Sequence, residues 1–382
     1  MRFLLILLLC GSVSAKDYDP KIVQDLLKEE VLKRANSNLH ESPVTVTAFR
    51  CERSAGGIHD FYSEGDYWWP DTLNPAGPYV QRDGQTNPEN FVAHRYAMIR
   101  LSTLVANLTS AYLLTKDKKY IDAALIHIRA WFIDNETKMN PNLLFAQAIK
   151  GITTGRGVGI IDTIHFIEVV QSLMQMEKYG LLSDNELAAT KHWFSEYLTW
   201  MTTHPNGIDE RDAQNNHATC WVMQAAIFAK YTGNSDILQF CSDRYKNVLL
   251  PQQMAADGSF PRELRRTKPY GYSLFNLDAM ATVCRILSTE EDNLWTYTTP
   301  DGKNMQKGID YLLPFVTDKS SWTYQPDVMY WDEWPVAQPF LWLGAMGLKK
   351  QEYLEAWVSL PHFPTNHEVI RNLPIRNPLI WI

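Results

Sequence analysis

The sequence is poor in cysteine and lacks long apolar runs, and each shortage excludes a class of protein. Only five cysteines occur among 382 residues, with no CxxC pair, so neither a disulfide framework nor a thiolate metal cluster is expected. The apolar run near the start of the chain, residues 3–10, is too short for a membrane-spanning helix, which needs roughly 20 apolar residues. Acidic residues outnumber basic ones, and the net charge of -7 argues against nucleic acid as a partner.

The first fifteen residues have the pattern of a secretory signal peptide. Arg2 precedes a short apolar run that ends at Cys10, and small residues lead to Ala15. The pattern predicts cleavage after Ala15 and a secreted or periplasmic protein. A membrane anchor through a lipidated Cys10 is the weaker alternative, because Leu9 stands where a small residue is expected.

Residues 16–382 contain no linker rich in proline or serine, and we therefore expect one domain. Apolar residues recur mainly at helical spacing, and alternating β-branched runs are scarce. This indicates an all-α fold of antiparallel helical hairpins, an α/α barrel or toroid, with an irregular helical bundle as the alternative. The helical segments expected are 91–114, 119–133, 160–179, 183–203, 212–231, 236–250, 272–288, 305–313, 335–346 and 352–360. Gly180, Gly233 and Gly347 follow such segments, where a left-handed residue is favoured.

Three long segments between the expected helices are rich in glycine, proline and aromatic residues: 54–90, 139–159 and 322–334. Long loops in a compact domain are usually functional. In a helical toroid we expect these loops to gather at one rim and to wall a cleft.

Two separate segments carry side chains suited to proton transfer beside a carboxylate. QNNHATCW contains Asn216 and His217, and ELRRTKPYGYSLFNLDA contains two arginines and Tyr272. An amide can bind a carboxylate while a neighbouring imidazole handles a proton. Pro269 and Gly271 are expected to end any helix in the second segment, so that the arginines lie on a loop and Tyr272 opens the next helix. A helix N-terminus and an arginine both favour the phenolate, which otherwise forms near pH 10.

Each of these residues, taken singly, also has a structural explanation. Asn215 and Asn216 at a helix start are more often caps than catalytic groups, and a lone histidine is more often structural. Tyr272 would then be a core aromatic residue, and Arg266 would pair with Glu263. The case for catalysis rests on finding all of these residue types together.

The two segments resemble the alginate lyase superfamily, in which NNH is followed by ELxRT and YSLFNLDA. Three further segments, SAGGIHDFYSEGDYWWPD, DGQTNPENF and AQAIKGITTGRGVGIIDT, resemble the branch classed as polysaccharide lyase family 38. The similarity covers residues 54–279. The resemblance implies an α/α toroid that cleaves 4-linked polyuronates, either alginate or β-1,4-glucuronan, by β-elimination.

The resemblance also implies roles for individual residues. Asn216 matches the amide that engages the substrate carboxylate, His217 matches the catalytic histidine, and Tyr272 matches the catalytic tyrosine. The family arginine aligns with Arg266, whereas the longer spacing in the related alginate lyases selects Arg265. Both arginines remain open, with Arg266 preferred.

Further residues are expected to bind the sugar chain. Gln147 would help to hold the carboxylate, and Arg156 would bind the carboxylate of a neighbouring uronate. Aromatic side chains from two loops would stack on sugar rings across the cleft. The other expected binding residues are Asn215, Tyr67, Trp68, Trp69, Tyr330 and Trp331.

The configuration of the substrate at C5 decides the catalytic roles. The C5 hydrogen becomes acidic once Arg266 and Asn216 neutralise the neighbouring carboxylate. In mannuronate and glucuronate this hydrogen lies on the same face as O4, so Tyr272 acts as base and then as acid. In guluronate the two lie on opposite faces, so His217 is the base and Tyr272 the acid. The scheme needs no cofactor and no metal.

Two other functions fit parts of the pattern. An α/α-barrel glycoside hydrolase needs two opposed carboxylic acids, which Glu64, Asp66, Asp332 and Glu333 would supply. A non-catalytic polysaccharide-binding protein would keep the aromatic loops, but it has no use for the Asn, His, Arg and Tyr together. An anionic polysaccharide is the partner expected, with no nucleic acid and no membrane unless Cys10 carries a lipid.

Overall fold

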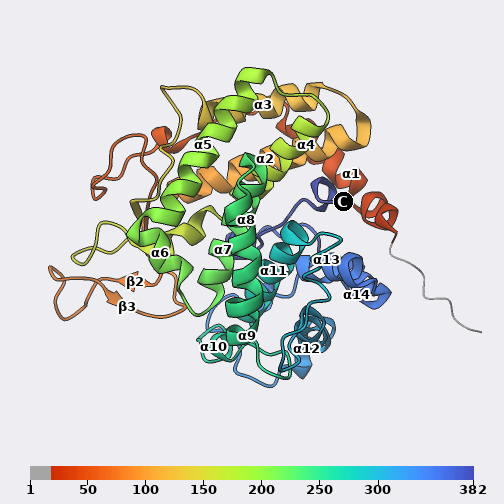
Figure 1. The fold of residues 1–382 in the computed structure, drawn as a ribbon. Coiled ribbons are helices and arrows are strands. Elements are labelled where there is room, and N and C mark those ends of the chain that lie inside the picture. Colours follow the sequence, from red (N-terminus) through yellow and green to blue (C-terminus); the bar gives the residue numbers. More distant parts are fainter. Residues whose placement is uncertain (1–18) are drawn as a thin grey trace, which may run out of the picture.

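The computed structural model describes residues 19–382, so the predicted signal peptide and Cys10 lie outside the described residues. Within that range the chain is mainly helical, as predicted, and its strands are short (Figure 1). The helices are α1 (Pro20–Asn38), α2 (Ala93–Thr115), α3 (Lys119–Phe132), α4 (Phe166–Lys178), α5 (Asp184–Thr203), α6 (Pro205–Arg211), α7 (Asn216–Thr232), α8 (Ser235–Arg244), α9 (Leu250–Gln253), α10 (Pro261–Leu264), α11 (Pro269–Leu287), α12 (Met305–Thr317), α13 (Pro339–Leu348), α14 (Gln351–Val358) and α15 (His367–Arg371). The strands are β1 (Tyr62–Glu64), β2 (Trp68–Trp69), β3 (Val80–Gln81) and β4 (Phe145–Ala148).

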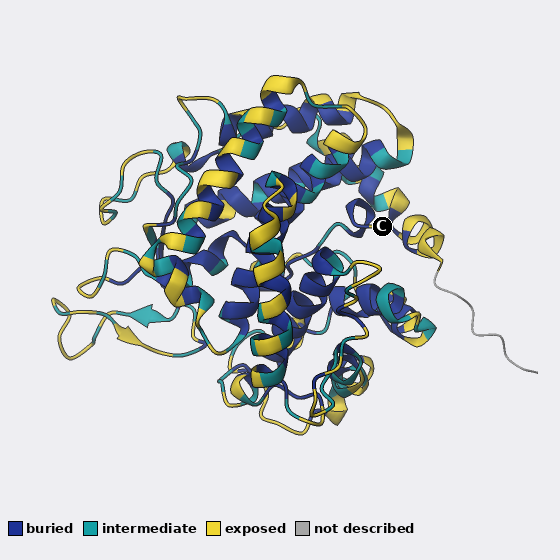
Figure 2. Ribbon diagram, viewed as in Figure 1, coloured by how far each residue is buried: buried dark blue, intermediate teal, exposed yellow. Residues whose placement is uncertain are grey.

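An inner series of helices forms the centre of the molecule. Helices α2, α4, α7, α11 and α13 contact one another in that order, while α3, α5, α8 and α14 pack on their outer sides. The inner helices are buried on nearly all faces, and the outer ones expose one side (Figure 2). A helix that is apolar all round is stable only when surrounded, which accounts for the inner position of the alanine-rich α7. The arrangement is the α/α toroid expected from the periodicity.

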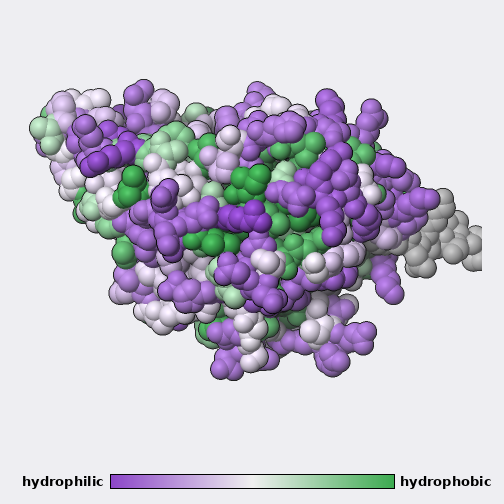
Figure 3. Space-filling model, turned by 90° about the horizontal axis from the view of Figure 1, so that it is seen from above, coloured by the Kyte–Doolittle hydropathy of each residue, from purple (hydrophilic) through white to green (hydrophobic). Residues whose placement is uncertain are grey.

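The outer surface is consistent with this layering. Seen from above, it is largely hydrophilic, with apolar side chains gathered in its middle (Figure 3). The C-terminal 3₁₀-helix η6 (Pro378–Ile380) returns to pack against α1, α2 and α4. The cysteines at positions 51, 220, 241 and 284 are free thiols.

Two predicted helix ends are confirmed and one is wrong. Gly180 follows α4 at φ 63° and Gly233 ends α7 at φ 76°, both in the left-handed conformation. Gly347, however, lies inside α13, and Lys349 takes the left-handed position at φ 55°. A Cβ at Gly347 would lie 2.3 Å from the Trp295 ring, so this glycine serves close packing instead of helix termination.

Other boundaries also differ from the prediction. Residues 157–163 form a 3₁₀-helix, η2, before α4 begins. The helix predicted from residue 212 begins only at Asn216, as α7, because Asp212 is the C-cap of α6. Pro269 and Gly271 do not end a helix; Pro269 is the first residue of α11, where its fixed φ and missing N–H are tolerated. Tyr272 therefore lies one turn inside α11. Helix α1 was not predicted at all.

The loops converge at one end of α7 and α11, as expected. Strand β1 pairs in parallel with β4, which joins loop 54–90 to loop 139–159. Strands β2 and β3 form an antiparallel pair in a projecting arm (Figure 1). The third loop reaches the same end, because the Asp327 carboxylate accepts hydrogen bonds from the backbone N–H groups of Tyr270 and Gly271.

Candidate functional site

A cavity of about 260 Å³ collects most of the residues expected to act on the substrate. It lies where the loops meet the first turns of α7 and α11. Its lining comprises Asp66, Tyr67, Trp68, Gln81, Gln147, Arg156, Val158, Ile161, Asn216, His217, Arg266, Tyr272, Phe275, Arg371 and Asn372.

Tyr272 and Arg266 are in direct contact within this cavity. The Arg266 guanidinium donates to the Tyr272 hydroxyl oxygen at 3.3 Å and lies 4.3 Å from the centroid of its ring. The Tyr272 hydroxyl in turn donates to that of Tyr67 at 2.8 Å. Arg266 also forms a bidentate ion pair with Asp83, at 2.6 and 3.1 Å, and not with Glu263. Arg266 therefore already has one anionic partner.

The protonation state of Tyr272 differs from the expectation. Burial, together with the nearby Tyr67 hydroxyl, raises the pKa of Tyr272 well above its usual value, and Arg266 offsets only part of this rise. The side chain is only 9% exposed, so the loss of hydration outweighs the positive potential. Tyr272 is therefore a neutral phenol, which can donate a proton.

Asn216 and His217 are adjacent at the start of α7, and each contacts a buried glutamate. The Asn216 backbone N–H and side-chain Nδ2 donate to the two oxygens of Glu263 at 2.8 and 2.9 Å. Nδ1 of His217 lies 2.6 Å from Oε1 of Glu210. Burial alone would lower the pKa of His217, but the Glu210 carboxylate outweighs burial and leaves this pKa raised. Asn215 takes the N-cap position without a side-chain capping bond and does not line the cavity.

Gln147 and Arg156 line the cavity and contact each other. Arg156 donates from Nε to the Gln147 carbonyl and from a terminal nitrogen to Gln147 Oε1, both at 3.0 Å. The same guanidinium lies 5.8 Å from the centroid of the Trp68 ring. Gln147 Nε2 donates to Asp162 at 3.0 Å. Arg156 has no ion pair with any described residue, so its charge is available to an anion.

The remaining predicted residues are divided between the cavity and the surface. Tyr67 and Trp68 line the cavity, whereas Trp69 packs under Arg82 and donates to the Gln85 carbonyl. Trp331 lies against Tyr270 and Lys319, away from the lining. The ring of Tyr330 lies 5.4 Å from the ammonium of Lys268, which also faces Tyr67 and Tyr272. Arg265 is exposed and outside the cavity.

The sequence interpretation missed several charged residues that surround the site. Glu210 and Asp83 hold His217 and Arg266 from other segments, and Arg371 reaches the cavity from near the C-terminus. Lys268 is buried in an ion pair with Glu368 at 2.5 Å. Glu263 is a partial exception. It lies in the recognised ELxRT motif, but the motif does not indicate its contact with Asn216.

The acidic residues considered for a hydrolase do not form an opposed pair. Among them only Asp66 lines the cavity, and Asp332 and Glu333 are exposed. Burial would raise the pKa of Asp66, but Arg371 and Arg95 outweigh burial and lower this pKa to about 2. Glu64 is held by Arg53 in a bidentate ion pair, at 2.5 and 2.7 Å. An ionised, paired Asp66 has no proton for a leaving group. The described residues also contain no group of three or more potential metal ligands.

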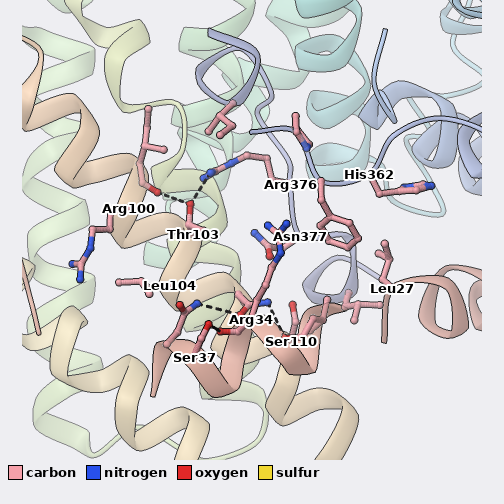
Figure 4. Close-up of a pocket in the computed structure, with 18 of the residues that line it drawn as sticks. Leu27, Arg34, Ser37, Arg100, Thr103, Leu104, Ser110, His362, Arg376 and Asn377 are labelled. Atoms are coloured by element: carbon pink, nitrogen blue, oxygen red, sulfur yellow. Dashed lines mark hydrogen bonds between the residues drawn. The ribbon is translucent and has the colours of Figure 1, made fainter. Parts of the chain in front are cut away.

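A second cavity of about 430 Å³ lies between α1, α2 and the C-terminal segment (Figure 4). Each of its arginines is engaged by a carboxylate: Arg34 by Glu30, Arg100 by Glu41 and Arg376 by Glu168. Arg376 also donates to the Thr103 hydroxyl at 2.7 Å (Figure 4). None of the four residues identified as catalytic lines this cavity, and the smaller one is the candidate active site.

Comparison with known proteins identifies the family of the chain. The alginate lyase family model matches residues 45–322. A solved alginate lyase from Bacteroides ovatus has a TM-score of 0.81 at 30% sequence identity, covering 95% of this chain and 96% of that one. No curated protein matches the sequence.

More distant structures share the fold alone. Alginate lyase A1-III from Sphingomonas species A1 has a TM-score of 0.54 at 14% identity, over 82% of this chain and 84% of that one. A histidine-to-alanine variant of A1-III, solved in complex with a tetrasaccharide, has a TM-score of 0.56 at 14% identity, over 87% and 88%. The family model covers most of the chain, and the Bacteroides structure extends the likeness over nearly all of it. The chain therefore belongs to the alginate lyase family of polysaccharide lyases.

Proposed function

We propose that this protein cleaves 4-linked polyuronates by β-elimination, with alginate as the first substrate. The observation that carries the proposal is the meeting of Tyr272, Arg266, Asn216 and His217 in one cavity. The four residues come from two segments far apart in sequence, and each type serves a different need of the reaction. The solved alginate lyases that resemble this chain support the choice of substrate.

The substrate carboxylate must be neutralised before the C5 proton can leave. Arg266 carries the charge for this step, and Asn216 and Gln147 border the same cavity with amide groups. These groups would stabilise the enolate-like dianion as it forms. Arg156, which has no ion pair with any described residue, is placed to bind the carboxylate of an adjacent uronate.

The bond changes then follow. A base takes the C5 proton, the released electron pair forms the C4–C5 double bond, the C4–O4 bond breaks, and O4 receives a proton. The neutral state of Tyr272 supports its role as the acid in every version of this reaction. With guluronate His217 is the base. With mannuronate or glucuronate Tyr272 itself must first lose a proton, and its contact with Arg266 supports that step.

Tyr272→Phe is the sharpest test, because it removes one hydroxyl and keeps the ring. We expect kcat to fall by about 10²-fold to 10⁴-fold, the usual contribution of a general acid or base, while polymer binding persists. The ultraviolet absorbance of the unsaturated uronate product measures the reaction, and a hydrolase would give no such product. Tyr324→Phe removes a hydroxyl from an exposed tyrosine outside the cavity and should leave kcat unchanged. Near-normal elimination by Tyr272→Phe would overturn the mechanism.

The preferred polymer is decided by a panel of mannuronan, guluronan and β-1,4-glucuronan, with analysis of the products. Glucuronan cleavage by the same residues is the alternative function.

Assignment to polysaccharide lyase family 38 and a secreted or periplasmic location both remain predictions. The location is tested by whether the exported protein begins at Lys16.

A further inference from the structure

The two adjacent residues that begin α7 are both held by buried carboxylates from outside that helix. Glu210 comes from the last turn of α6 and contacts His217, while Glu263 comes from α10 and contacts Asn216. Both glutamates are only 1% exposed. Neither lines the cavity, so neither is placed to touch a substrate.

Glu263 performs a task that the sequence next to α7 leaves undone. Asn215 occupies the N-cap position but makes no side-chain capping bond. The N–H of Asn216, one of the backbone donors that a helix N-terminus leaves without an intrahelical partner, donates to Glu263 Oε1, and the second oxygen holds the Asn216 amide. The acceptor fixes the orientation of that amide, with Nδ2 toward the glutamate. Glu263 also lies only three residues before Arg266, so one short segment fixes the positions of both carboxylate-binding groups.

Glu210 selects one form of the imidazole. A carboxylate only accepts hydrogen bonds, so the 2.6 Å contact requires a proton on Nδ1 of His217. Nε2 is then the ring nitrogen left for the cavity, toward which 22% of the side chain remains exposed. The same contact fixes the plane of the ring.

Carboxylates are costly at these two positions. Burial raises the pKa of both Glu210 and Glu263 despite the groups that offset it. Negative charge this close to a cavity for a polyanion also repels the substrate. Amide or apolar residues would fill the same space without either cost, since buried ion pairs are often replaceable without loss of stability. A carboxylate is needed, however, to hold His217 by its Nδ1 proton and to keep both donors of Asn216 satisfied.

We propose that Glu210 and Glu263 are positioning residues for the elimination, Glu210 acting through His217 and Glu263 acting through Asn216. The inference rests on the proposed function, because it assigns roles relative to that reaction. It adds Glu210, which neither the motif resemblance nor the cavity lining identified, and it gives a role to Glu263, which lies in the ELxRT motif but outside the cavity lining.

The first experiment replaces Glu210 with glutamine, which preserves shape and an acceptor but removes the charge. His217 is also faced by Glu263 and Arg266, and Glu210 by Asp209 and Arg156; these groups remain. Burial then acts on His217 without its nearest anion, so its pKa should fall. The limb of the kcat–pH profile that reflects the titration of His217 should move to lower pH. We also expect kcat at the optimum to fall about 100-fold, the cost of a misplaced reacting group.

The control is Glu196→Gln. Glu196 lies 3.5 Å from His192 on an exposed face of α5, so the same substitution breaks another Glu–His pair away from the cavity. It should leave kcat and its pH profile unchanged. If Glu210→Gln retains both the wild-type kcat and the wild-type pH profile, the positioning role is wrong.

Glu263→Gln tests the second half of the proposal. It leaves one acceptor for the two donors of Asn216, and we expect a higher KM and a lower kcat. Because Glu263 acts through Asn216, the substitution should have no further effect on catalysis in an Asn216→Ala background. Equal losses in both backgrounds would show that Glu263 has a separate structural role.

A measurement on the unmodified protein covers the case in which the variants do not fold. The ¹⁵N resonances of His217 should show Nδ1 protonated throughout and Nε2 titrating; titration at Nδ1 would overturn the role of Glu210. If the wild-type protein releases no unsaturated product from any polyuronate, the proposed function fails while this test still reports on the contact. If the wild type is active and Glu210→Gln behaves like it, only the inference fails.

Discussion

Arg265 and Arg266 are neighbours in sequence but have different surroundings. Arg266 lines the cavity and contacts both Asp83 and the Tyr272 hydroxyl, whereas Arg265 is exposed and lies outside the lining. The loop between α10 and α11 turns one guanidinium inward and the other outward. Spacing alone leaves open whether Arg265 or Arg266 binds the substrate carboxylate. The geometry favours Arg266.

Paired alanine substitutions test this choice. Arg266→Ala should lower kcat/KM by about 10²-fold to 10³-fold, because it removes charge stabilisation where the dianion forms. Arg265→Ala should change kcat/KM little. Initial rates on one polyuronate, with circular dichroism to verify folding, measure both variants. A large loss from Arg265→Ala together with a small loss from Arg266→Ala would reverse the assignment.

At the residue scale, the sequence identified residues that lie in recognisable motifs and missed their partners. His217, Asn216 and Tyr272 stand in segments whose spacing relates to chemistry. Glu210 and Asp83 act only through contacts made by folding, and no local pattern distinguishes them from surface acids. The raised pKa of Tyr272 was also unpredictable, because the extent of its burial depends on loops that arrive from elsewhere.

At the scale of elements, helix ends were harder to predict than helices. Pro269 was interpreted as a terminator although a proline is equally suited to the first turn of a helix. The pattern predicts Gly347 as a helix end, but it lies inside α13, where the absence of a side chain makes room for the Trp295 ring. Helix α1 was missed because its buried face is a narrow stripe, Val23, Leu27, Val31 and Ala35, within a strongly charged segment.

A coupled pair of substitutions tests the packing at Gly347. Gly347→Ala should destabilise the protein by about 1–3 kcal/mol, because its Cβ overlaps the Trp295 ring. The cost should shrink by at least about 0.5 kcal/mol in a Trp295→Leu background, which relieves the overlap. Gly180, with φ 63° and nothing within 4 Å of an added Cβ, is the control. Gly180→Ala introduces only backbone strain. Denaturant titration should therefore give the same loss of unfolding free energy in the wild-type and Trp295→Leu backgrounds.

At the scale of the whole molecule, the helical toroid followed from periodicity, because the inner helices are apolar on most faces. The C-terminal return was unpredictable. Glu168 on α4 accepts hydrogen bonds from the backbone N–H groups of Arg376 and Asn377, and the Ile380 carbonyl accepts from two glutamines of α4. These contacts join the last residues to the centre of the fold.

We expect one cooperative unfolding transition. The apolar core runs without interruption from Val23 in α1 to Trp381, so no part of it can be exposed alone at low cost. Far-ultraviolet circular dichroism and tryptophan fluorescence should follow the same denaturant curve. Two separated transitions would contradict the single-domain prediction for residues 16–382.

The projecting arm that carries β2 and β3 has a consequence for handling the enzyme. Its tip is open to proteases, with the Leu73 side chain 94% exposed, while its base supplies the Asp83 carboxylate to Arg266. A single cut at the tip would leave the helical core folded and yet loosen the carboxylate that holds Arg266. Preparations can therefore lose activity through nicking while their helical content stays intact.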